Sequence, residues 1–318
     1  MKDKLASLKE AVSSLVNDGD TLVIEGFTHL ISFAAAHEII RQGKKDLTLA
    51  RLTPDLIYDQ MLAAGCAKKL VFSWAGNPGV GSLHAFRRLV ESKPAKPVDG
   101  APGRASAPSA PNPGLEIEEY SHFGMVARFS AGAANLPFWP LRNYMGTDIP
   151  GANPRIKQVT CPFTGEVLAA VPALRPDVTV VHAQRADRSG NAQVWGLLGV
   201  QKEAAFASKR VIVVAEEIVS ESVVRADPNR TLIPGNIVSA VCVEPWGAHP
   251  SYAQGYYDRD NDFYVKWDEI ARTEASLKAY LDEFVHGVAD RKGYMDKQPE
   301  LQRLKAKAQI CEGVNYGY

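Results

Sequence analysis

The chain has 318 residues, its 36 basic side chains balance 36 acidic ones, and 46% of its residues are hydrophobic. This composition is typical of a folded globular protein and excludes global disorder. Zero net charge argues against nucleic acid or an anionic membrane as the main partner, because both select basic surfaces. No apolar run reaches the ~18–20 residues that span a bilayer, and the N-terminus resembles no signal peptide, so we expect a cytoplasmic protein.

Cysteines and histidines are scattered along the chain. The four cysteines, Cys66, Cys161, Cys242 and Cys311, form no Cys-x-x-Cys pair. That spacing predicts neither a disulfide framework nor a structural zinc site. The seven histidines form no His-x-His or His-Glu-x-x-His motif, so we expect no metal centre.

Apolar strands alternate with helices through the first ninety residues. An amphipathic helix is predicted over residues 4–16, and the β-branched run Thr21–Ile24 suits a buried strand. A second helix is expected to end near Gln42, where Gly43 stops it. The further elements expected in this part are strands at 47–52 and 70–74, and helices at 55–64 and 83–91.

The alternation returns in the second half of the chain. Strands are expected at 178–183, 211–215 and 239–243, and helices at 200–208 and 269–286. This pattern predicts an α/β fold, with an open, mainly parallel sheet covered by helices on both faces and with peripheral additions.

The predicted organisation is one domain over residues 1–290. The Pro-, Ala- and Gly-rich segment 93–114 is interpreted as a flexible surface loop within that domain. Residues 291–318 form a polar C-terminal extension, which we expect to be helical to about Ile310 and to pack on the outside or fray.

Ligands of an open parallel sheet bind beyond the carboxyl ends of its strands. The first strand ends in Glu25-Gly26-Phe27-Thr28-His29, where Gly26 permits a sharp turn or a close approach to a ligand. Glu25 and His29 have the chemistry of an acid–base pair. Alternatively, Glu25 bridges locally and His29 faces solvent.

A second unusual loop, Ser73–Ser82, joins a predicted strand to a helix. Its Gly76-x-x-Gly79-x-Gly81 spacing departs from the dinucleotide fingerprint and from the P-loop, which argues against a nicotinamide site. Either the Asn77 side chain and the backbone amides hold a carbonyl oxygen or a phosphate, or the loop is a tight turn that requires glycine.

Two further segments have weaker chemical patterns. Glu216-Glu217 follows a predicted strand, where a carboxylate could be a nucleophile or base, or an ordinary exposed strand end. The aromatic, turn-rich segment Pro245–Tyr252 could line a pocket, or could be a loop held by Trp246.

Together these segments resemble the A-type subunits of the family I coenzyme A transferases, in the glutaconate/3-oxoadipate branch. Asn17-Asp18-Gly19-Asp20 and Gly26-Phe27 resemble the first family signature, in which Glu25 replaces the usual first glycine. The other matching segments are 42–48, 72–82, 161–166, 181–188, 216–219 and 249–253. The likeness covers nearly the whole chain except 93–114 and the tail after about 290.

The resemblance implies a two-subunit enzyme that moves CoA between carboxylic acids through a glutamyl-CoA thioester. The nucleophilic glutamate is expected on a partner, the B-type CoA-transferase subunit, in a Ser-Glu-Asn-Gly type motif that this chain lacks. No catalytic nucleophile is therefore expected here. The residues expected by motif match to bind substrate or CoA are Gly26, Phe27, Thr28, Asn77, Gly79 and Gly81.

The resemblance also implies the reaction and its participants. We expect CoA transfer from succinyl-CoA to 3-oxoadipate, with the CoA thioester as substrate, no resident cofactor, and an α2β2 or (αβ)n hetero-oligomer. Glutaconate transfer and CoA-thioester hydrolysis are alternatives within the family, and a non-catalytic ligand-binding module is an alternative outside it. The dianionic substrates need a basic residue, for which Arg51, Arg142 and Arg185 are candidates.

Overall fold

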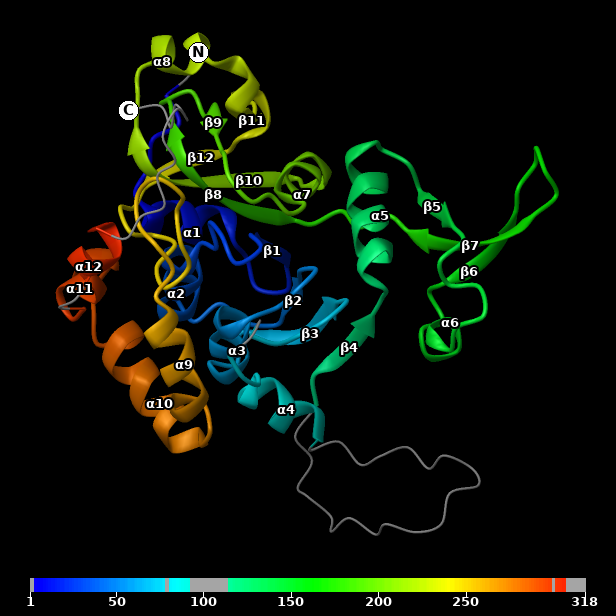
Figure 1. Ribbon diagram of the computed structural model, residues 1–318, viewed down its shortest axis with the longest axis horizontal. Helices are drawn as coiled ribbons and strands as arrows, with labels where there is room; N and C mark the ends of the chain where they lie inside the picture. The colour runs from blue at the N-terminus through cyan, green and yellow to red at the C-terminus, as the bar shows by residue number, and fades with distance from the viewer. Residues whose placement is uncertain (1–2, 78–79, 92–113, 299–300, 307–318) are drawn as a thin grey trace.

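The computed structural model describes residues 3–77, 80–91, 114–298 and 301–306 (Figure 1). Its centre is a nine-stranded sheet in which parallel strands follow the order β12-β10-β8-β1-β2-β3-β4. The parallel strands are β1 (Thr21–Glu25), β2 (Leu47–Ala50), β3 (Ala67–Phe72), β4 (Glu116–Glu119), β8 (Val178–Ala186), β10 (Arg210–Ile218) and β12 (Ala240–Val243). The predicted α/β fold with a mainly parallel sheet is confirmed. Two short strands, β9 (Ala192–Gln193) and β11 (Thr231–Ile233), extend the sheet in antiparallel pairing.

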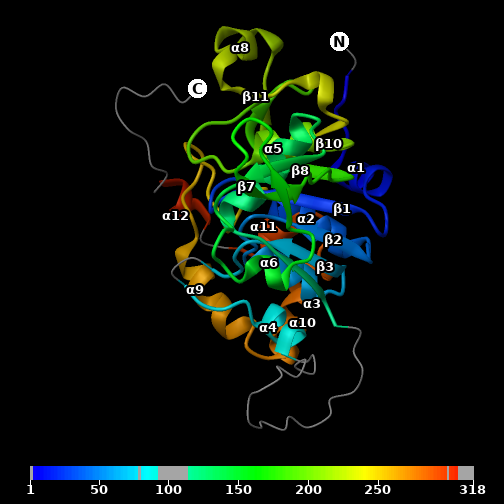
Figure 2. The ribbon, with the colours of Figure 1, turned by 90° about the vertical axis from the view of Figure 1, so that its right-hand side faces the viewer.

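Helices cover both faces of the sheet, as Figures 1 and 2 show. Leu22 and Ile24 of β1 belong to the core under one helical layer, whereas Val23 between them belongs to the core of the opposite layer. The first layer contains α1 (Leu8–Leu15), α2 (Phe33–Arg41), α3 (Leu56–Ala63), α4 (His84–Glu91), α9 (Asn261–Ile270) and α10 (Glu274–Leu281). The second contains α5 (His122–Ala133) and α7 (Gln201–Ala207). Successive side chains of a strand point to opposite faces of the sheet, so β1 contributes to the core on each side.

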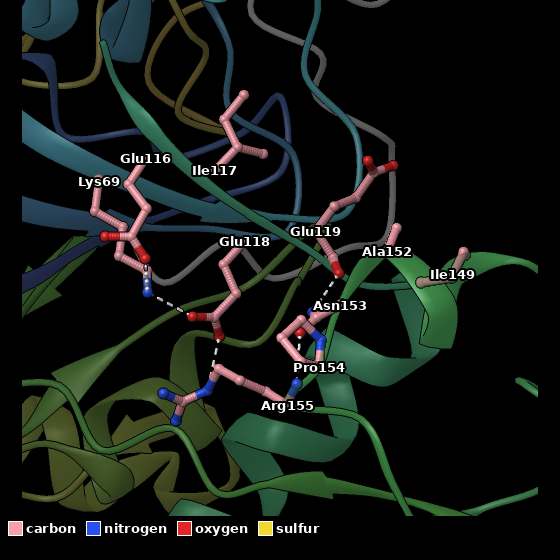
Figure 3. Close-up of a pocket in the computed structure, with 10 residues that line it drawn as sticks. All are labelled: Lys69, Glu116, Ile117, Glu118, Glu119, Ile149, Ala152, Asn153, Pro154 and Arg155. Atoms are coloured by element: carbon pink, nitrogen blue, oxygen red, sulfur yellow. Dashed lines mark hydrogen bonds and ion pairs between the residues drawn. The ribbon is translucent and has the colours of Figure 1, made fainter. Parts of the chain in front are cut away.

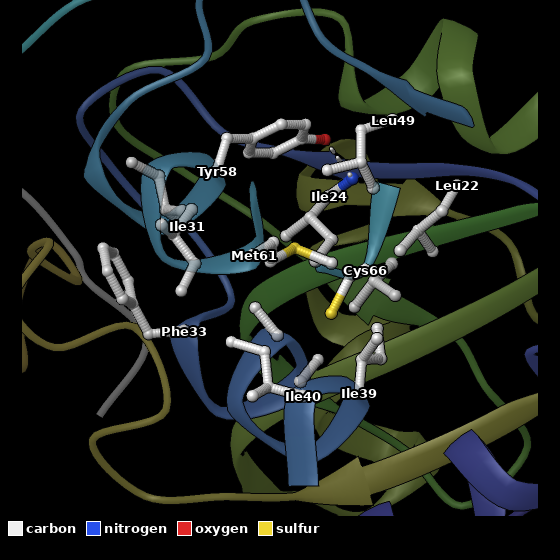
Figure 4. Packing of buried hydrophobic residues seen from close by; sticks show 14 of the residues in the cluster. Leu22, Ile24, Ile31, Phe33, Ile39, Ile40, Leu49, Tyr58, Met61 and Cys66 are labelled. Carbon is white, nitrogen blue, oxygen red and sulfur yellow. Dashed lines mark hydrogen bonds between the residues drawn. The ribbon is translucent and has the colours of Figure 1, made fainter. Parts of the chain in front are cut away.

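Close packing fixes α3 beneath β1 and β2. Figure 4 shows Tyr58 and Met61 of α3 beside Ile24 of β1. The buried Tyr58 hydroxyl accepts a hydrogen bond from the Ile24 amide and donates one to the Ala50 carbonyl, both at 3.1 Å. This bridge ties one helix to two neighbouring strands, so the loops that follow β1 and β2 are held in a fixed relation.

Side-chain caps set where two helices begin. Ser7 and Glu10 form a capping box, so α1 begins at Leu8 and not at residue 4 as predicted. Asp55 caps α3 by accepting a hydrogen bond from the Ile57 amide at 3.2 Å. This cap also brings the Asp55 carboxylate to the carboxyl end of β2.

The helix expected over 269–286 is interrupted, which corrects that prediction. Helix α9 ends at Ile270, and Thr273 starts α10 by accepting a hydrogen bond from the Ser276 amide at 3.1 Å. A short π-helix over Asp282–His286 follows α10. A polar side chain that caps a new helix competes with continuation of the preceding one.

A second, three-stranded antiparallel sheet was not predicted. Its strands β5 (Phe138–Leu141), β6 (Lys157–Thr160) and β7 (Val167–Pro172) lie in the order β5-β7-β6, beyond α5 in Figure 1. The one-turn helix α6 (Ile149–Ala152) precedes β6. The strands are short and partly exposed, so they lack the continuous apolar run that marks the buried parallel strands.

The beginning of the C-terminal stretch is buried, contrary to the expectation that it packs on the outside or frays. In α11 (Arg291–Asp296), Arg291 and Tyr294 are buried, and the Arg291 guanidinium donates to the carbonyls of Trp246 and His249, each at 2.6 Å. The remaining α-helices of the described residues are α8 (Glu221–Ala226) and α12 (Leu301–Ala306). The segment interpreted as a surface loop, 93–114, lies outside the described residues except for its last one.

Within the described residues, no helix is long and apolar enough to cross a membrane. The same residues contain no group of three or more His, Cys, Asp and Glu side chains that could hold a metal ion. Cys66, Cys161 and Cys242 are free thiols.

Candidate active site

The carboxyl ends of β1, β2 and β3 lie side by side at one edge of the main sheet. The three strands are neighbours and parallel, so the loops after Glu25, Ala50 and Phe72 emerge together. A hydrogen bond of 3.0 Å from the Gly76 amide to the Pro54 carbonyl joins the second and third loops. The two loops that the sequence singled out are therefore brought to one place.

The loop after β1 is sharply turned. Gly26 has φ +154°, and a Cβ at this position would lie 2.8 Å from the carbonyl oxygens of His29 and Leu30. Thr28 and Leu30 adopt the left-handed region with φ of +57° and +52°, which is uncommon for residues other than glycine. The Ser251 hydroxyl donates to the Thr28 carbonyl at 2.7 Å and holds this turn against the 251–257 segment.

Glu25 is a buried carboxyl at this edge, with only 2% of its surface exposed. Its Oε2 has no hydrogen-bond partner among the described residues. Burial raises the pKa of Glu25 to about 7, and the positive charge of Arg51 opposes that rise. Near neutral pH this carboxyl can therefore hold or release a proton.

Glu25 and His29 do not form an acid–base pair. His29 is fully buried, its Nδ1 is 2.8 Å from the Leu197 carbonyl oxygen, and its Nε2 accepts from the Gln254 amide at 3.1 Å. Burial lowers the pKa of His29 to about 4. The alternative that His29 faces solvent is also wrong, because both ring nitrogens bond to backbone and fix the loop.

Arg51 is the basic residue at this edge among the three candidates. Its guanidinium is buried, and donates to both Asp55 carboxylate oxygens, at 3.0 and 3.2 Å, and to the Gly26 carbonyl. Arg142 directly follows β5 of the three-stranded sheet and pairs with Glu166. Arg185, at the end of β8, donates to the Gln193 side chain at 2.7 Å.

Asn77 is buried with an unused side chain. Only 3% of its surface is exposed, and neither its Oδ1 nor its Nδ2 has a partner among the described residues. Its backbone is fixed by hydrogen bonds to Gly81 and Val80, at 3.3 and 3.1 Å. Because buried amides are nearly always hydrogen-bonded, a rigid, unpaired amide points to a ligand or a water at this position.

Gly81 needs to be glycine for a reason that the sequence did not reveal. Its φ is +126°, and a Cβ would lie 2.9 Å from Oδ1 of Asp268 in α9. Gly79, the other glycine expected to contact substrate, lies outside the described residues.

Two cavities open beside the loop after β1. A very small one lies over Arg51, and a larger one, of about 320 Å³, lies along the 252–261 segment. Thr28 and Arg259 line both cavities, and Phe27 lines the smaller one. Tyr252 lines the larger cavity, while Trp246 stacks on Tyr257 with ring centroids 4.3 Å apart, so both interpretations of the 245–252 segment hold.

Sequence reasoning missed Arg259 and Tyr264. Both reach the site from the opposite end of the chain, and the Arg259 guanidinium lies 3.8 Å from the centroid of the Tyr264 ring. Asp258 and Asp260 flank Arg259, so the pattern is typical of a solvated charged loop. The turn-rich aromatic run that ends at Tyr252 was the nearest available signal.

A different cavity, shown in Figure 3, lies between β4 and α6. Most of its charges are paired: Lys69 pairs with Glu116 at 2.8 Å and with Glu118 at 2.6 Å. Glu118 also pairs with Arg128 at 2.9 Å and Arg155 at 3.4 Å. Paired charges of this kind are a structural network, so we place the candidate site at the β1–β3 edge.

An open parallel sheet whose carboxyl edge gathers buried, unpaired polar groups is the arrangement of an α/β enzyme that binds a small polar substrate. The family model described as coenzyme A transferase matches residues 100–244 of the chain. This match covers β4 and β8 to β12 of the main sheet together with the whole three-stranded sheet.

Full-length relatives extend the match to the rest of the chain. The chain is 54% identical to the A-type subunit of 3-oxoadipate CoA-transferase from Pseudomonas knackmussii, over 93% of this chain and 99% of that protein. It is 31% identical to the A-type subunit of glutaconate CoA-transferase from Acidaminococcus fermentans, over 98% and 97% of the two chains. The crystal structure of glutaconate CoA-transferase from that organism superposes with a TM-score of 0.84, at 29% identity, over 99% and 98% of the chains. The chain therefore belongs to the coenzyme A transferase family, which confirms the family identified from the motifs.

Proposed function

We propose that the chain is the A-type subunit of a heteromeric enzyme that moves CoA from succinyl-CoA to 3-oxoadipate. The observation that carries the proposal is the 54% identity, over nearly the full length of both chains, to the corresponding subunit of a 3-oxoadipate CoA-transferase. The CoA thioester is the substrate, and the enzyme holds no resident cofactor.

The covalent nucleophile in this proposal is a glutamate of the B-type subunit. A carboxylate is a weak nucleophile toward a thioester, so the enzyme must position it and stabilise the oxyanion that forms. One described carboxylate, Glu216, favours this division of labour. It is buried, and both its oxygens are engaged by His182, Tyr257 and the Trp246 amide.

This chain then supplies the surroundings of the reacting acyl group. Gly26, Phe27 and Thr28 line the acyl site, and Asn77 with the amides near Gly79 and Gly81 contacts the thioester oxygen or a substrate carboxylate. The buried side-chain amide of Asn77, which has no partner among the described residues, supports this assignment. An oxyanion donor of this kind contributes about 3–4 kcal/mol to transition-state stabilisation.

Exposed apolar side chains on the three-stranded sheet support a hetero-oligomer, α2β2 or (αβ)n. Phe163, in the β6–β7 hairpin, is 94% exposed, and Phe138, Met145 and Val167 are 39–49% exposed. Figure 1 shows this hairpin projecting from the body of the chain. Several large apolar side chains exposed on one small sheet are typical of a surface that a partner protein covers.

The test is succinyl-CoA-dependent CoA transfer to 3-oxoadipate, measured on this chain alone and on the chain co-purified with its B-type partner. We expect activity in the complex alone, with a borohydride-sensitive thioester on the partner. Activity of the isolated chain would overturn the division of labour and direct attention to Glu217 and Glu25.

Glutaconate is the second candidate acid. The 31% identity to the glutaconate CoA-transferase chain and the TM-score of 0.84 favour it. A complex that ignores 3-oxoadipate but transfers CoA to glutaconate would select it. A complex that releases free CoA without an acceptor would instead indicate thioester hydrolysis.

A further inference from the structure

Arg259 occupies a central position beside the candidate site. It lines both cavities next to Thr28, together with residues from three separate parts of the chain. The larger cavity, of about 320 Å³, falls within the range of small-molecule sites. Its lining residues are Thr28, Tyr252, Gln254, Tyr257, Asp258, Arg259 and Asn261.

The carboxylate-binding edge of Arg259 is engaged by no group of the described residues. Its Nε and Nη2 are buried and have no hydrogen-bond partner among the described residues. Arg142 shows what this edge does elsewhere in the chain: its Nε and Nη2 each donate at 2.7 Å to one oxygen of Glu166. Arg259 thus has the same bidentate fork, in a half-buried side chain, and no carboxylate of the described residues pairs with it.

The Arg259 fork is held in place. The guanidinium carbon lies 3.8 Å from the centroid of the Tyr264 ring, and Tyr264 is itself buried in α9. Stacking on an aromatic ring fixes the plane of a guanidinium and leaves its edge available. The orientation of the fork therefore does not depend on a bound ligand.

The local charge also favours an anion. The smaller cavity is lined by two guanidinium groups, Arg51 and Arg259, and by one carboxylate, Asp55, which Arg51 already engages at 3.0 and 3.2 Å. Asp258 lines the larger cavity, but within the described part of the chain it forms no ion pair with Arg259. Arg259 is therefore the guanidinium of the smaller cavity that no described carboxylate engages.

We propose that Arg259 binds the free carboxylate of the substrate acid, the one that does not become the thioester. This inference rests on the proposed transfer of CoA between dicarboxylic acids. The succinyl group of the donor and 3-oxoadipate each keep one ionised carboxylate while the other end reacts. One bidentate arginine serves both half-reactions and makes the enzyme select diacids over monoacids.

The experiment compares 3-oxoadipate with its monomethyl ester at the non-reacting carboxyl, in the complex of this chain with its B-type partner. We expect the wild-type complex to prefer the diacid strongly. Arg259→Met should lower kcat/KM for the diacid by about 10²-fold or more, because it removes a hydrogen-bonded partner of a buried charge. The value for the ester should change little, so the preference collapses.

Two further variants separate binding from folding. Arg259→Lys keeps the charge but loses the fork, and should retain an intermediate preference for the diacid. Arg272→Met, at an exposed arginine paired with Asp268 at 2.7 Å, is the matched control and should leave the preference unchanged. If Arg259→Met does not fold, the lysine variant alone decides the question.

The outcomes distinguish this inference from the proposed function. Equal losses for diacid and ester in either Arg259 variant would make Arg259 a structural residue and overturn the inference. A wild-type complex that transfers CoA only to glutaconate would overturn the choice of 3-oxoadipate. The same comparison would then be made with glutaconate and its monomethyl ester, and a preserved diacid preference in Arg259→Met would again reject the inference.

Discussion

Glu25 and Glu216 are buried carboxyls in parallel strands of one sheet, yet their surroundings differ. Glu216 Oε1 lies 2.7 Å from Nε2 of His182 and accepts from the Tyr257 hydroxyl, while its Oε2 accepts from the Trp246 amide at 2.6 Å. Glu25 Oε2 has no partner among the described residues. The hydrogen bonds of Glu216 hold a loop in place. Glu25 instead has an oxygen that can still accept a hydrogen bond, at the edge where substrate is proposed to bind.

The β10 end is therefore expected to matter for folding. Glu216→Ala leaves His182, Tyr257 and the Trp246 amide without their shared acceptor. The free energy of unfolding should fall by about 3–5 kcal/mol, because these partners would stay buried without the hydrogen bond that offsets their loss of water. Urea denaturation of the purified chain measures this change. A loss below about 1 kcal/mol would show that the network does not secure the loop.

The β1–β3 edge should respond in the opposite way. Asn77→Ala should lower turnover of the complex by about 10²-fold or more, through loss of an oxyanion donor. Its unfolding free energy should change little, because the side chain makes no hydrogen bond to the described residues.

Asn191→Ala is the matched control for Asn77. Asn191 donates to Asp187 at 2.7 Å and accepts from the Gly235 amide at 2.9 Å, so its removal should destabilise the chain and spare turnover per folded molecule. Wild-type turnover in Asn77→Ala would remove Asn77 from the site.

Much of the fold could be predicted because its signals are local. The buried strands β1 and β8 are apolar runs, and the loops at Gly26 and Asn77 stand directly after such runs. The three-stranded sheet could not be predicted in this way, because strands such as β6 are short and partly exposed. Local pattern suffices only where a strand is buried on both faces.

Only part of the site could be predicted from the sequence, and the reason is related. Arg259 joins Thr28 only through the tertiary fold, and its neighbours Asp258 and Asp260 resemble a solvated turn. Gly81 illustrates the same limit, since its lack of a side chain is dictated by Asp268 of a distant helix. A motif in the sequence shows where a strand ends. The residues that meet it at the sheet edge, such as Arg259, are distant in the sequence and are identified only from the fold.

The pH dependence of stability tests whether Glu25, unlike Glu216, lacks a partner for its charge. Its folded-state pKa of about 7 lies above the ordinary glutamate value of 4.5, so wild-type stability falls as pH rises from about 4.5 to 7. Glu25→Gln removes this loss and should be more stable at pH 8 by up to about 3 kcal/mol, with the difference vanishing near pH 4.

Urea denaturation of both proteins between pH 4 and 8 measures the effect. Glu244, whose pKa is also raised to about 7 by burial, and Asp59, whose pKa is raised to about 6 by burial, are present in both proteins and cancel in the difference. Parallel stability curves would show that Glu25 finds a partner for its charge in the folded chain.

The smallest effect is expected at Glu217, beside the satisfied carboxylate of β10. Its Oε1 accepts from the Tyr256 hydroxyl at 2.7 Å, and a glutamine oxygen can accept the same hydrogen bond. Glu217→Gln should therefore keep turnover of the complex within about twofold of wild type. A fall of tenfold or more, with unfolding unchanged, would place a reacting carboxylate on this chain. The distinction between a structural β10 end and a substrate-binding β1–β3 edge would then fail.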